Sequence, residues 1–249
     1  MPRDYRTDSY PALDFDRSVE LDGSTLWLSN DNDIQLGLVN NWSIGMWIRI
    51  KSSATHYLLN LAPISGANNS VLFWITSTQL NITLRDEDNS PLDFQAAQWA
   101  SAVTTDTWYH LVITWDGTDL KLFRDASEII ATTVIVDASG TMAIDTKRIF
   151  YGATVIGTLP FDGFLGPLAL WRTILDSDDM TEIHNPATGT PFEIDLTSNV
   201  GGYDKAGDCF HFWRPNTRDP GITDQGIATG INFNDATVSK LNISTETPA

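Results

Sequence analysis

The sequence predicts an all-β fold in which two antiparallel sheets pack face to face as a sandwich. Three observations support this prediction: alternating apolar and polar residues recur in short runs, turn residues separate these runs, and only one segment has a helical pattern. The chain has 249 residues, of which 42% are hydrophobic, including nine Trp and eleven Phe. A chain of this kind can bury a full core as one sandwich. We therefore predict a single domain over residues 1–249, with its core at about 12–185 and a C-terminal extension over 186–249.

The strand pattern is clearest over residues 42–50 and 108–115. One face of the first run is wholly apolar, with Trp42, Ile44, Met46, Ile48 and Ile50. Both faces of the second run carry bulky residues, which is typical of a central strand that is covered on both sides. Further strands are predicted over residues 71–75, 80–84, 120–124, 129–136, 149–151 and 164–171.

One short helix is predicted near residues 176–185. Asp176 or Ser177 can cap its first turn, and Pro186 ends it. The extension that follows is rich in Gly, Asn, Asp and Thr, but it also carries large apolar residues that need burial: Phe192, Phe210, Phe212, Trp213, Ile231 and Phe233. We therefore predict closing strands near 231–233 and 238–243 instead of a linker.

The chain has a formal net charge of −17 and a single cysteine, Cys209. Binding to nucleic acid or to anionic membrane surfaces depends on Lys and Arg, so the sequence argues against both partners. The residues after Met1 lack the apolar core of a signal peptide, and no stretch of about 18 apolar residues could span a membrane. We expect neither a signal peptide nor a transmembrane segment, and we expect Cys209 to be a small buried residue.

Four blocks of sequence resemble a known family. Residues 108–117 with 120–125 resemble the central hairpin of laminin-G-like modules in the concanavalin-A-like lectin/glucanase superfamily. Residues 12–21 are similar to the opening strands of the family, and residues 161–171 are similar to its closing strand. Residues 42–48 are similar to a further segment of the family. The resemblance implies the family's fold, a two-sheet antiparallel jelly roll.

Two places depart from the family's pattern. The second hairpin turn, where the family usually has Asp-Gly, is Asp125-Ala126. Because Ala disfavours a positive φ, we expect another turn type there. Where the family often has an acidic residue, the chain has Gly166-Pro167, so the resemblance implies no charged role at that place.

The end of the chain is similar to the ends of such modules in virion proteins of tailed bacteriophages. The similarity lies in residues 210–214, 224–226 and 243–248. It implies a structural or interaction module on the virion surface, in the capsid or the tail, that is made in the host cytoplasm. Its expected partners are other virion proteins and further copies of itself. Assembly in a reducing cytoplasm agrees with the single cysteine.

No set of catalytic residues is recognisable, so we expect that the protein is not an enzyme. Glycosidases need a pair of carboxylates, about 5 Å apart in retaining enzymes, and those of this fold class carry a closely spaced acidic strand motif. The nearest match is Glu193-Ile194-Asp195, which lacks a third acid and lies in the extension. The histidines His56, His110, His184 and His211 are scattered along the sequence. We expect His110 to be a hydrogen-bonded residue of the core.

Glycan binding, as a lectin or adhesin that contacts host sugars, is the alternative function. Sugars stack on exposed aromatic rings, and Trp99 and Trp47 are the candidate ligand-binding residues. Trp99, which falls between the predicted strands, is the aromatic residue that we most expect to be exposed, with packing under a loop as the competing interpretation. A lectin should also bring aromatic and amide side chains together on one concave face or loop rim.

Calcium is the one ion whose binding the sequence leaves open. Two acidic runs offer oxygen donors, from Asp31 and Asp33 and from Asp86 and Asp88. Ca²⁺ takes about six to eight such oxygens, but the same composition is common in turns whose Asx side chains bond their own backbone. We favour the turn interpretation and expect no cofactor.

Overall fold

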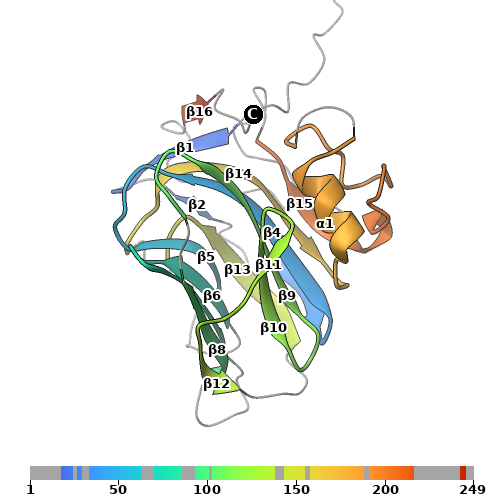
Figure 1. Cartoon of the computed structure of the whole chain (residues 1–249), viewed down its shortest axis with the longest axis horizontal. Helices are drawn as coiled ribbons and strands as arrows, with labels where there is room; N and C mark the ends of the chain where they lie inside the picture. The colour runs from blue at the N-terminus through green and yellow to red at the C-terminus, as the bar shows by residue number, and fades with distance from the viewer. Residues whose placement is uncertain are drawn as a thin grey trace, which may run out of the picture.

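The computed structural model describes residues 18–24, 27–29, 34–62, 70–85, 93–100, 103–137, 143–154, 158–187, 191–215 and 242–244. Two antiparallel eight-stranded sheets pack face to face, as the sequence predicts (Figure 1). In this described part, one α-helix, α1 (Ser177–His184), and one 3₁₀ turn, η1 (Ala206–Asp208), accompany them. Within the described residues no helix is long and apolar enough to cross a membrane.

The first layer is called the covered sheet, because α1 and the segment after it pack on its outer face. Its strands in spatial order are β11 (Ser127–Ile129), β10 (Leu120–Arg124), β9 (Trp108–Trp115), β4 (Trp42–Ile50), β14 (Asp162–Trp171), β1 (Ser18–Asp22) and β16 (Asn242–Ser244), and β15 (Cys209–Trp213) also pairs with β14. Both β15 and β16 come from the C-terminal extension, which therefore contributes two strands to this sheet.

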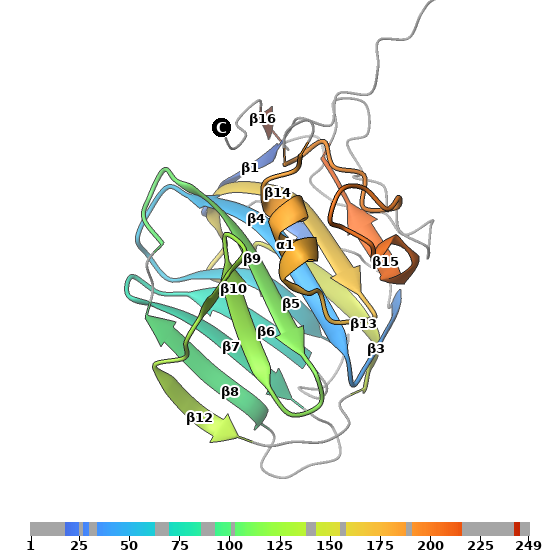
Figure 2. The ribbon, with the colours of Figure 1, turned by 45° about the vertical axis from the view of Figure 1, so that its right-hand side comes forward.

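The second layer is called the open sheet, because no described helix or strand packs on its outer face. Its strands in spatial order are β12 (Thr133–Asp137), β8 (Asp93–Ala100), β7 (Gln79–Arg85), β6 (Ser70–Ile75), β5 (His56–Ala62), β13 (Ala143–Tyr151) and β2 (Leu28–Ser29), and β3 (Ile34–Val39) also pairs with β13. Figure 2 shows α1 on the far side of the sandwich from this layer, beside β15.

The main core lies between the two sheets. The apolar face predicted for residues 42–50 points into it, and its five side chains are all buried. Strand β9 is central, as predicted, since it lies between β4 and β10. Tyr109, Leu111, Ile113 and Trp115 enter the main core from β9, whereas His110 and Val112 are buried on the opposite face.

The prediction of one continuous strand over residues 129–136 is wrong, because these residues belong to two strands and the connection between them. β11 ends at Ile129 in the covered sheet, and β12 begins at Thr133 in the open sheet. Residues 130–132 carry the chain from one sheet to the other, and Thr132 N–H donates to the Gln98 carbonyl at 2.8 Å. An apolar run does not reveal where a chain changes sheets, and so the sequence suggested one continuous strand. Residues 231–233 and 238–241 lie outside the described part, and β16 begins at Asn242.

A second core covers the outer face of the covered sheet. It joins strands β9, β14 and β15 to α1 and to the segment 191–206. Its buried members are Val112, Ala169, Trp171, Leu175, Met180, Ile183, Ile194, Leu196, Tyr203, Cys209 and Phe212. The predicted burial of Cys209 is thus confirmed. Within this core, Trp171 Nε1 donates to the Tyr203 hydroxyl at 2.9 Å, which in turn donates to the Leu196 carbonyl.

Carboxylates on and before α1 hold the second core together. Asp176 caps the helix, as predicted, by accepting from the N–H groups of Asp178 and Asp179. The buried Asp179 carboxylate accepts in return from Asp176 N–H and also from Asp204 N–H. Glu182 accepts from Ala187 N–H and Gly202 N–H. The helix is therefore hydrogen-bonded to the loop that follows it, and burial raises the pKa of Asp179.

Gly166 and Pro167 form an irregularity in β14, and this irregularity lets Phe192 pack closely against the strand. The register of β14 against β4 shifts between Leu165 and Leu168, and this is a position where Pro, which has no N–H, is tolerated. A Cβ on Gly166 would lie 2.5 Å from Phe192 Cζ. The glycine is therefore needed for the close approach of Phe192, which accounts for the departure from the family's pattern at this place.

The turn at Asp125 and Ala126 differs from our expectation. Both residues have positive φ, 52° and 62°, and they join Arg124 to Ser127 in the β10–β11 hairpin. This is the type I′ pattern that the family's Asp-Gly would also adopt, so the expected change of turn type is wrong. Asp125 Oδ1 accepts from His110 N–H at 2.9 Å, and Ala126 packs against the second core. These contacts offset the strain of a left-handed Ala.

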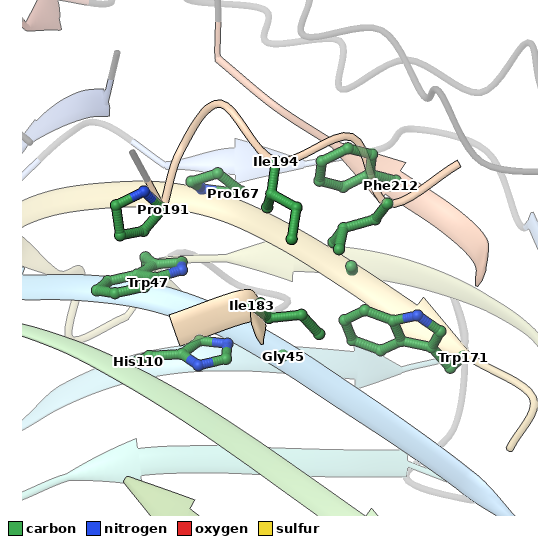
Figure 3. Close-up of a pocket in the computed structure, with 11 residues that line it drawn as sticks. Gly45, Trp47, His110, Pro167, Trp171, Ile183, Pro191, Ile194 and Phe212 are labelled. Carbon is green, nitrogen blue, oxygen red and sulfur yellow. The ribbon is translucent and has the colours of Figure 1, made fainter. Parts of the chain in front are cut away.

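Trp47, His110 and His184 form a stacked cluster beneath the second core. The ring centroid of Trp47 lies 4.9 Å from that of His110 and 5.5 Å from that of His184. His110 is buried, as predicted, but its Nδ1 has no hydrogen-bond partner among the described residues, so the expected hydrogen bonding is wrong for that atom. Beside it lies an apolar cavity of about 10 Å³ (Figure 3), which is close to the space that one water needs.

Replacing Gly166 with Ala is expected to destabilise the protein by about 1–3 kcal/mol, the usual cost of overpacking. The new Cβ would lie 2.5 Å from Phe192 and 2.8 Å from Trp47 Cβ. Urea denaturation measures this change in the free energy of unfolding. Gly207→Ala is the matched control, because a Cβ at Gly207 has no neighbour within 4 Å. A Gly166→Ala variant as stable as the control would contradict the packing described here.

Acid is expected to destabilise the protein through His110. Burial, and then the charge of His184, lower the pKa of His110 from 6.5 to about 3. The unfolded chain therefore binds this proton at a higher pH than the folded chain, so stability falls as the pH drops below 6.5 and levels off near 3. The total loss from this group is about 5 kcal/mol. Unfolding free energies of wild type and His110→Gln, measured from pH 7 to pH 4, should converge as the pH falls; a constant difference would refute the prediction.

Candidate functional site

The exposure predicted for Trp99 is wrong. Trp99 lies on β8 and not between strands, its side chain faces the main core, and only 1% of it is exposed. It does line a hollow of about 220 Å³ together with residues of the β9–β10 turn, β10, β11 and the crossing to β12, including Asp119, Lys121 and Ile130. Ligand pockets are typically about 300–1,000 Å³ and enclose most of the ligand. This hollow is therefore smaller than an ordinary small-molecule site.

Trp47 is likewise closed to a sugar ring. Only 3% of its side chain is exposed, because His110, His184 and Phe192 pack around the indole. The cavity beside it has room for about one water molecule. The two tryptophans named from the sequence are thus both buried, and the structure does not bring them together.

The acidic pair Glu193 and Asp195 flanks Ile194, a residue of the second core, and Asp195 stabilises the local turn. Both residues are exposed, on either side of the buried Ile194. Asp195 Oδ1 accepts from Thr197 N–H at 3.0 Å, as in an Asx turn. Burial would raise the pKa of Asp195, but hydrogen bonds from Thr197 outweigh that effect and the pKa is lowered. A general acid of a glycosidase needs a raised pKa instead.

The candidate calcium ligands Asp31, Asp33, Asp86 and Asp88 lie outside the described residues. In the part of the chain that the structure describes, no group of three or more His, Cys, Asp or Glu side chains is placed to hold a metal ion. Calcium binding therefore stays a prediction from the sequence.

The outer face of the open sheet presents a different set of side chains. On β6, Val71, Phe73 and Ile75 point into the main core, so Trp74 points outward. On β7 the same alternation turns Asn81 outward, between the core residues Leu80 and Ile82. The outward set that the structure describes is Ser29, Tyr57, Asn60, Ala62, Leu72, Trp74, Gln79, Asn81, Thr83, Arg85, Ala96, Gln98, Ala100, Thr133, Arg148 and Phe150.

Aromatic and amide residues form one row across this face. Strand pairing places Tyr57 opposite Trp74, Trp74 opposite Asn81, and Asn81 opposite Gln98. The ring centroids of Tyr57 and Trp74 are 6.2 Å apart, and both rings are partly exposed. With neighbouring strands about 4.8 Å apart, the row extends over about 14 Å. We call Tyr57, Trp74, Asn81 and Gln98 the aromatic–amide row.

Hydrogen bonds fix the amides of the row. Gln79 Nε2 donates to Gln98 Oε1 at 3.3 Å, and Asn81 Nδ2 donates to the Gln79 carbonyl at 3.3 Å. Asn81 itself is only 2% exposed, and the neighbouring Asn60 and Thr83 are 5% and 7% exposed. The amides that this face leaves partly exposed are those of Gln79 and Gln98, beside the partly exposed rings of Tyr57 and Trp74.

The aromatic–amide row could be recognised only in part from the sequence. Alternation over residues 80–84 turns Asn81 and Thr83 away from the core, which is a readable signal. Trp74 lies in an apolar run in which both faces appear buried, so periodicity does not mark it as exposed. The pairing that brings four separate strands into register leaves no trace in the sequence of any one strand.

Comparisons with known proteins agree with this fold. A family model described as the concanavalin A-like lectin/glucanases superfamily matches residues 22–181. A putative carbohydrate binding protein from Bacteroides ovatus has a similar structure, with a TM-score of 0.55, 12% identity, and coverage of 92% of this chain and 59% of that one. The native heptameric SAP-like pentraxin from Limulus polyphemus gives a TM-score of 0.53, 17% identity, and coverage of 70% of this chain and 84% of that one.

A search of curated proteins finds no match. At identities of 12% and 17% the structural similarities show the fold alone. The family model covers most of the sandwich, including the hairpin of β9 and β10 and strand β14, whose residues gave the resemblance. The chain belongs to the concanavalin A-like lectin/glucanase superfamily.

Proposed function

We propose that this protein is a non-catalytic glycan-binding module whose ligand lies on the outer face of the open sheet. The observation that carries the proposal is the aromatic–amide row, because it combines the two kinds of group that a sugar needs. A partly exposed indole can stack on the apolar face of a sugar ring. Side-chain amides both donate and accept hydrogen bonds, as sugar hydroxyls do.

The position of the row supports the proposal. The outer face of the covered sheet is occupied by α1 and the second core. A ligand on that face would have to displace packed side chains. The open sheet keeps partly exposed Tyr57, Trp74 and Gln98 on its outer face. A similar structure from Bacteroides ovatus is named as a putative carbohydrate binding protein. Membership in a lectin and glucanase superfamily is compatible with the same ligand class.

Binding without hydrolysis is the part of the proposal that rests on the carboxylates. The outward side chains described on the open sheet include no Asp or Glu. Glu193 and Asp195 belong to the opposite side of the sandwich, where they flank Ile194 in the second core. A glycosidase needs two carboxylates on either side of the scissile bond, and this face does not present that pair.

A place on a bacteriophage virion is the finer proposal, and it rests on the sequence similarity of the chain end. Residues 210–213 in that similarity belong to β15, and Phe212 is buried in the second core, so the fold itself accounts for this part. Residues 224–226 lie outside the described residues. Mass spectrometry of purified particles would find the chain at many copies if the proposal is correct and would miss it otherwise. Homo-oligomerisation belongs to the same proposal.

Trp74→Ala is expected to weaken binding to a glycan selected on an array by about 30-fold, as for other aromatic anchor residues. The substitution removes the stacking surface and leaves the main core intact, since Trp74 points outward. Isothermal calorimetry measures the dissociation constant. Trp108→Ala, on the outer face of the covered sheet, is the matched control and should bind like wild type. If a folded Trp74→Ala variant binds the glycan with unchanged affinity, the proposed site is wrong.

The double variant Glu193→Gln, Asp195→Asn is expected to bind the same glycan with wild-type affinity, because both side chains lie away from the aromatic–amide row. Neither protein should release reducing ends during long incubation with the bound glycan. A loss of about 1 kcal/mol in stability is expected from Asp195→Asn, since the carboxylate accepts two bonds from Thr197. Sugar release that disappears in the double variant would contradict the non-catalytic assignment.

A further inference from the structure

We propose that the glycan bound on the open face carries an acidic group, a carboxylate or a sulfate ester, which Arg148 and Arg85 receive at one end of the face. This inference rests on the proposed function and names the class of its ligand. It starts from charge: within the described residues, these two arginines are the only charged side chains that point outward from the open sheet. The chain as a whole carries a net charge of −17.

Strand register places the two arginines in one row. Arg148 of β13 lies opposite Ala62 of β5, and Arg85 of β7 lies opposite position 70 of β6. Ile149 and Tyr151 point into the main core, so Arg148 points outward. Three inter-strand spacings separate the two arginines, about 14 Å between Cα atoms. Between them on β5, Ala62 presents only a methyl group, so no large side chain of β5 separates the two arginines.

The hydrogen bonding of Arg148 is incomplete in the protein. Its Nε is buried and has no hydrogen-bond partner among the described residues, and no ion pair to Arg148 is formed within that part of the chain. Arg85 does interact within the protein, and the inference does not depend on its being free. A carboxylate or sulfate can accept two parallel bonds from one guanidinium, which a neutral hydroxyl cannot. An acidic ligand would therefore meet a partly exposed arginine that no carboxylate of the described residues neutralises.

The arginine pair and the aromatic–amide row are separated along the strands. Trp74 lies four residues from position 70 on β6, which is about 13 Å at 3.3 Å per residue. The same sugar ring cannot both stack on Trp74 and place its acidic group between the arginines. The ligand is thus an oligosaccharide in which the acidic sugar lies apart from the stacked one.

Paired ligands test this inference on the full chain. Oligosaccharides that contain a hexuronic acid are compared with their carboxyl-reduced counterparts, and sulfated oligosaccharides with their desulfated counterparts, by isothermal calorimetry. Wild type is expected to bind the acidic member of one pair at least about tenfold more tightly, as charge-assisted bonds predict. That preference should shrink as salt is raised, because the arginines are partly exposed.

Four variants separate the contribution of the site from that of net charge. Arg148→Gln should bring the ratio of acidic to neutral affinity close to one and leave the neutral affinity unchanged. Arg85→Gln should lower the ratio to a smaller extent. Lys121→Gln makes the same change in net charge on β10 of the covered sheet and should keep the wild-type ratio. Thermal unfolding confirms that each variant is folded, and Arg148→Lys, which keeps the charge, should retain part of the preference.

The outcomes distinguish this inference from the proposed function. Equal affinity of wild type for both members of every pair, with binding still dependent on Trp74, overturns the acidic ligand and leaves glycan binding in place. A preference that Arg148→Gln keeps overturns the role of the arginine. Absence of binding to any glycan, acidic or neutral, overturns the proposed function and this inference with it.

Discussion

The architecture depends on one constraint: strands β4 and β9 carry large side chains on both faces. Ile44, Ile48 and Ile113 point into the main core, while Trp47 and Val112 point to the other side of the same sheet. A sheet of this composition cannot leave one face in water without exposing a broad apolar surface. The segment after β14 supplies the required cover, through α1 and β15. Gly166 gives Phe192 the space to pack against Trp47.

Because the covered sheet is buried on both sides, the open sheet is the layer whose outer face no described helix or strand covers. Its strands alternate between core residues such as Phe73 and Ile82 and outward residues such as Trp74 and Asn81. The two sheets therefore differ because strands β4 and β9 of the covered sheet carry large apolar residues on both faces, whereas strands of the open sheet alternate core residues with outward ones. The ligand face that we propose lies on the sheet with the simpler alternation.

Periodicity predicted much of the fold and little of the site. Residues 42–50, 108–115 and 120–124 alternate cleanly, and the structure has strands over these ranges, while Asp176 marked the start of the helix. The crossing between β11 and β12 was missed because an apolar run reads the same in either sheet. Trp99 was expected on the surface, but β8 was not recognised as a strand. The aromatic–amide row needs the register of four strands, which is a property of long-range pairing.

The turn at Asp125 and Ala126 bears on the order of folding. A left-handed Ala is unfavourable in an isolated hairpin, so this sequence, unlike Asn-Gly or Asp-Gly, does not favour early closure of β10 on β11. The bonds that hold Asp125 come from the backbone of His110 on β9. The hairpin is therefore expected to close late, after β9 has joined the sheet. Substitutions at Asp125 would then speed unfolding and leave the folding rate nearly unchanged, which stopped-flow kinetics can measure.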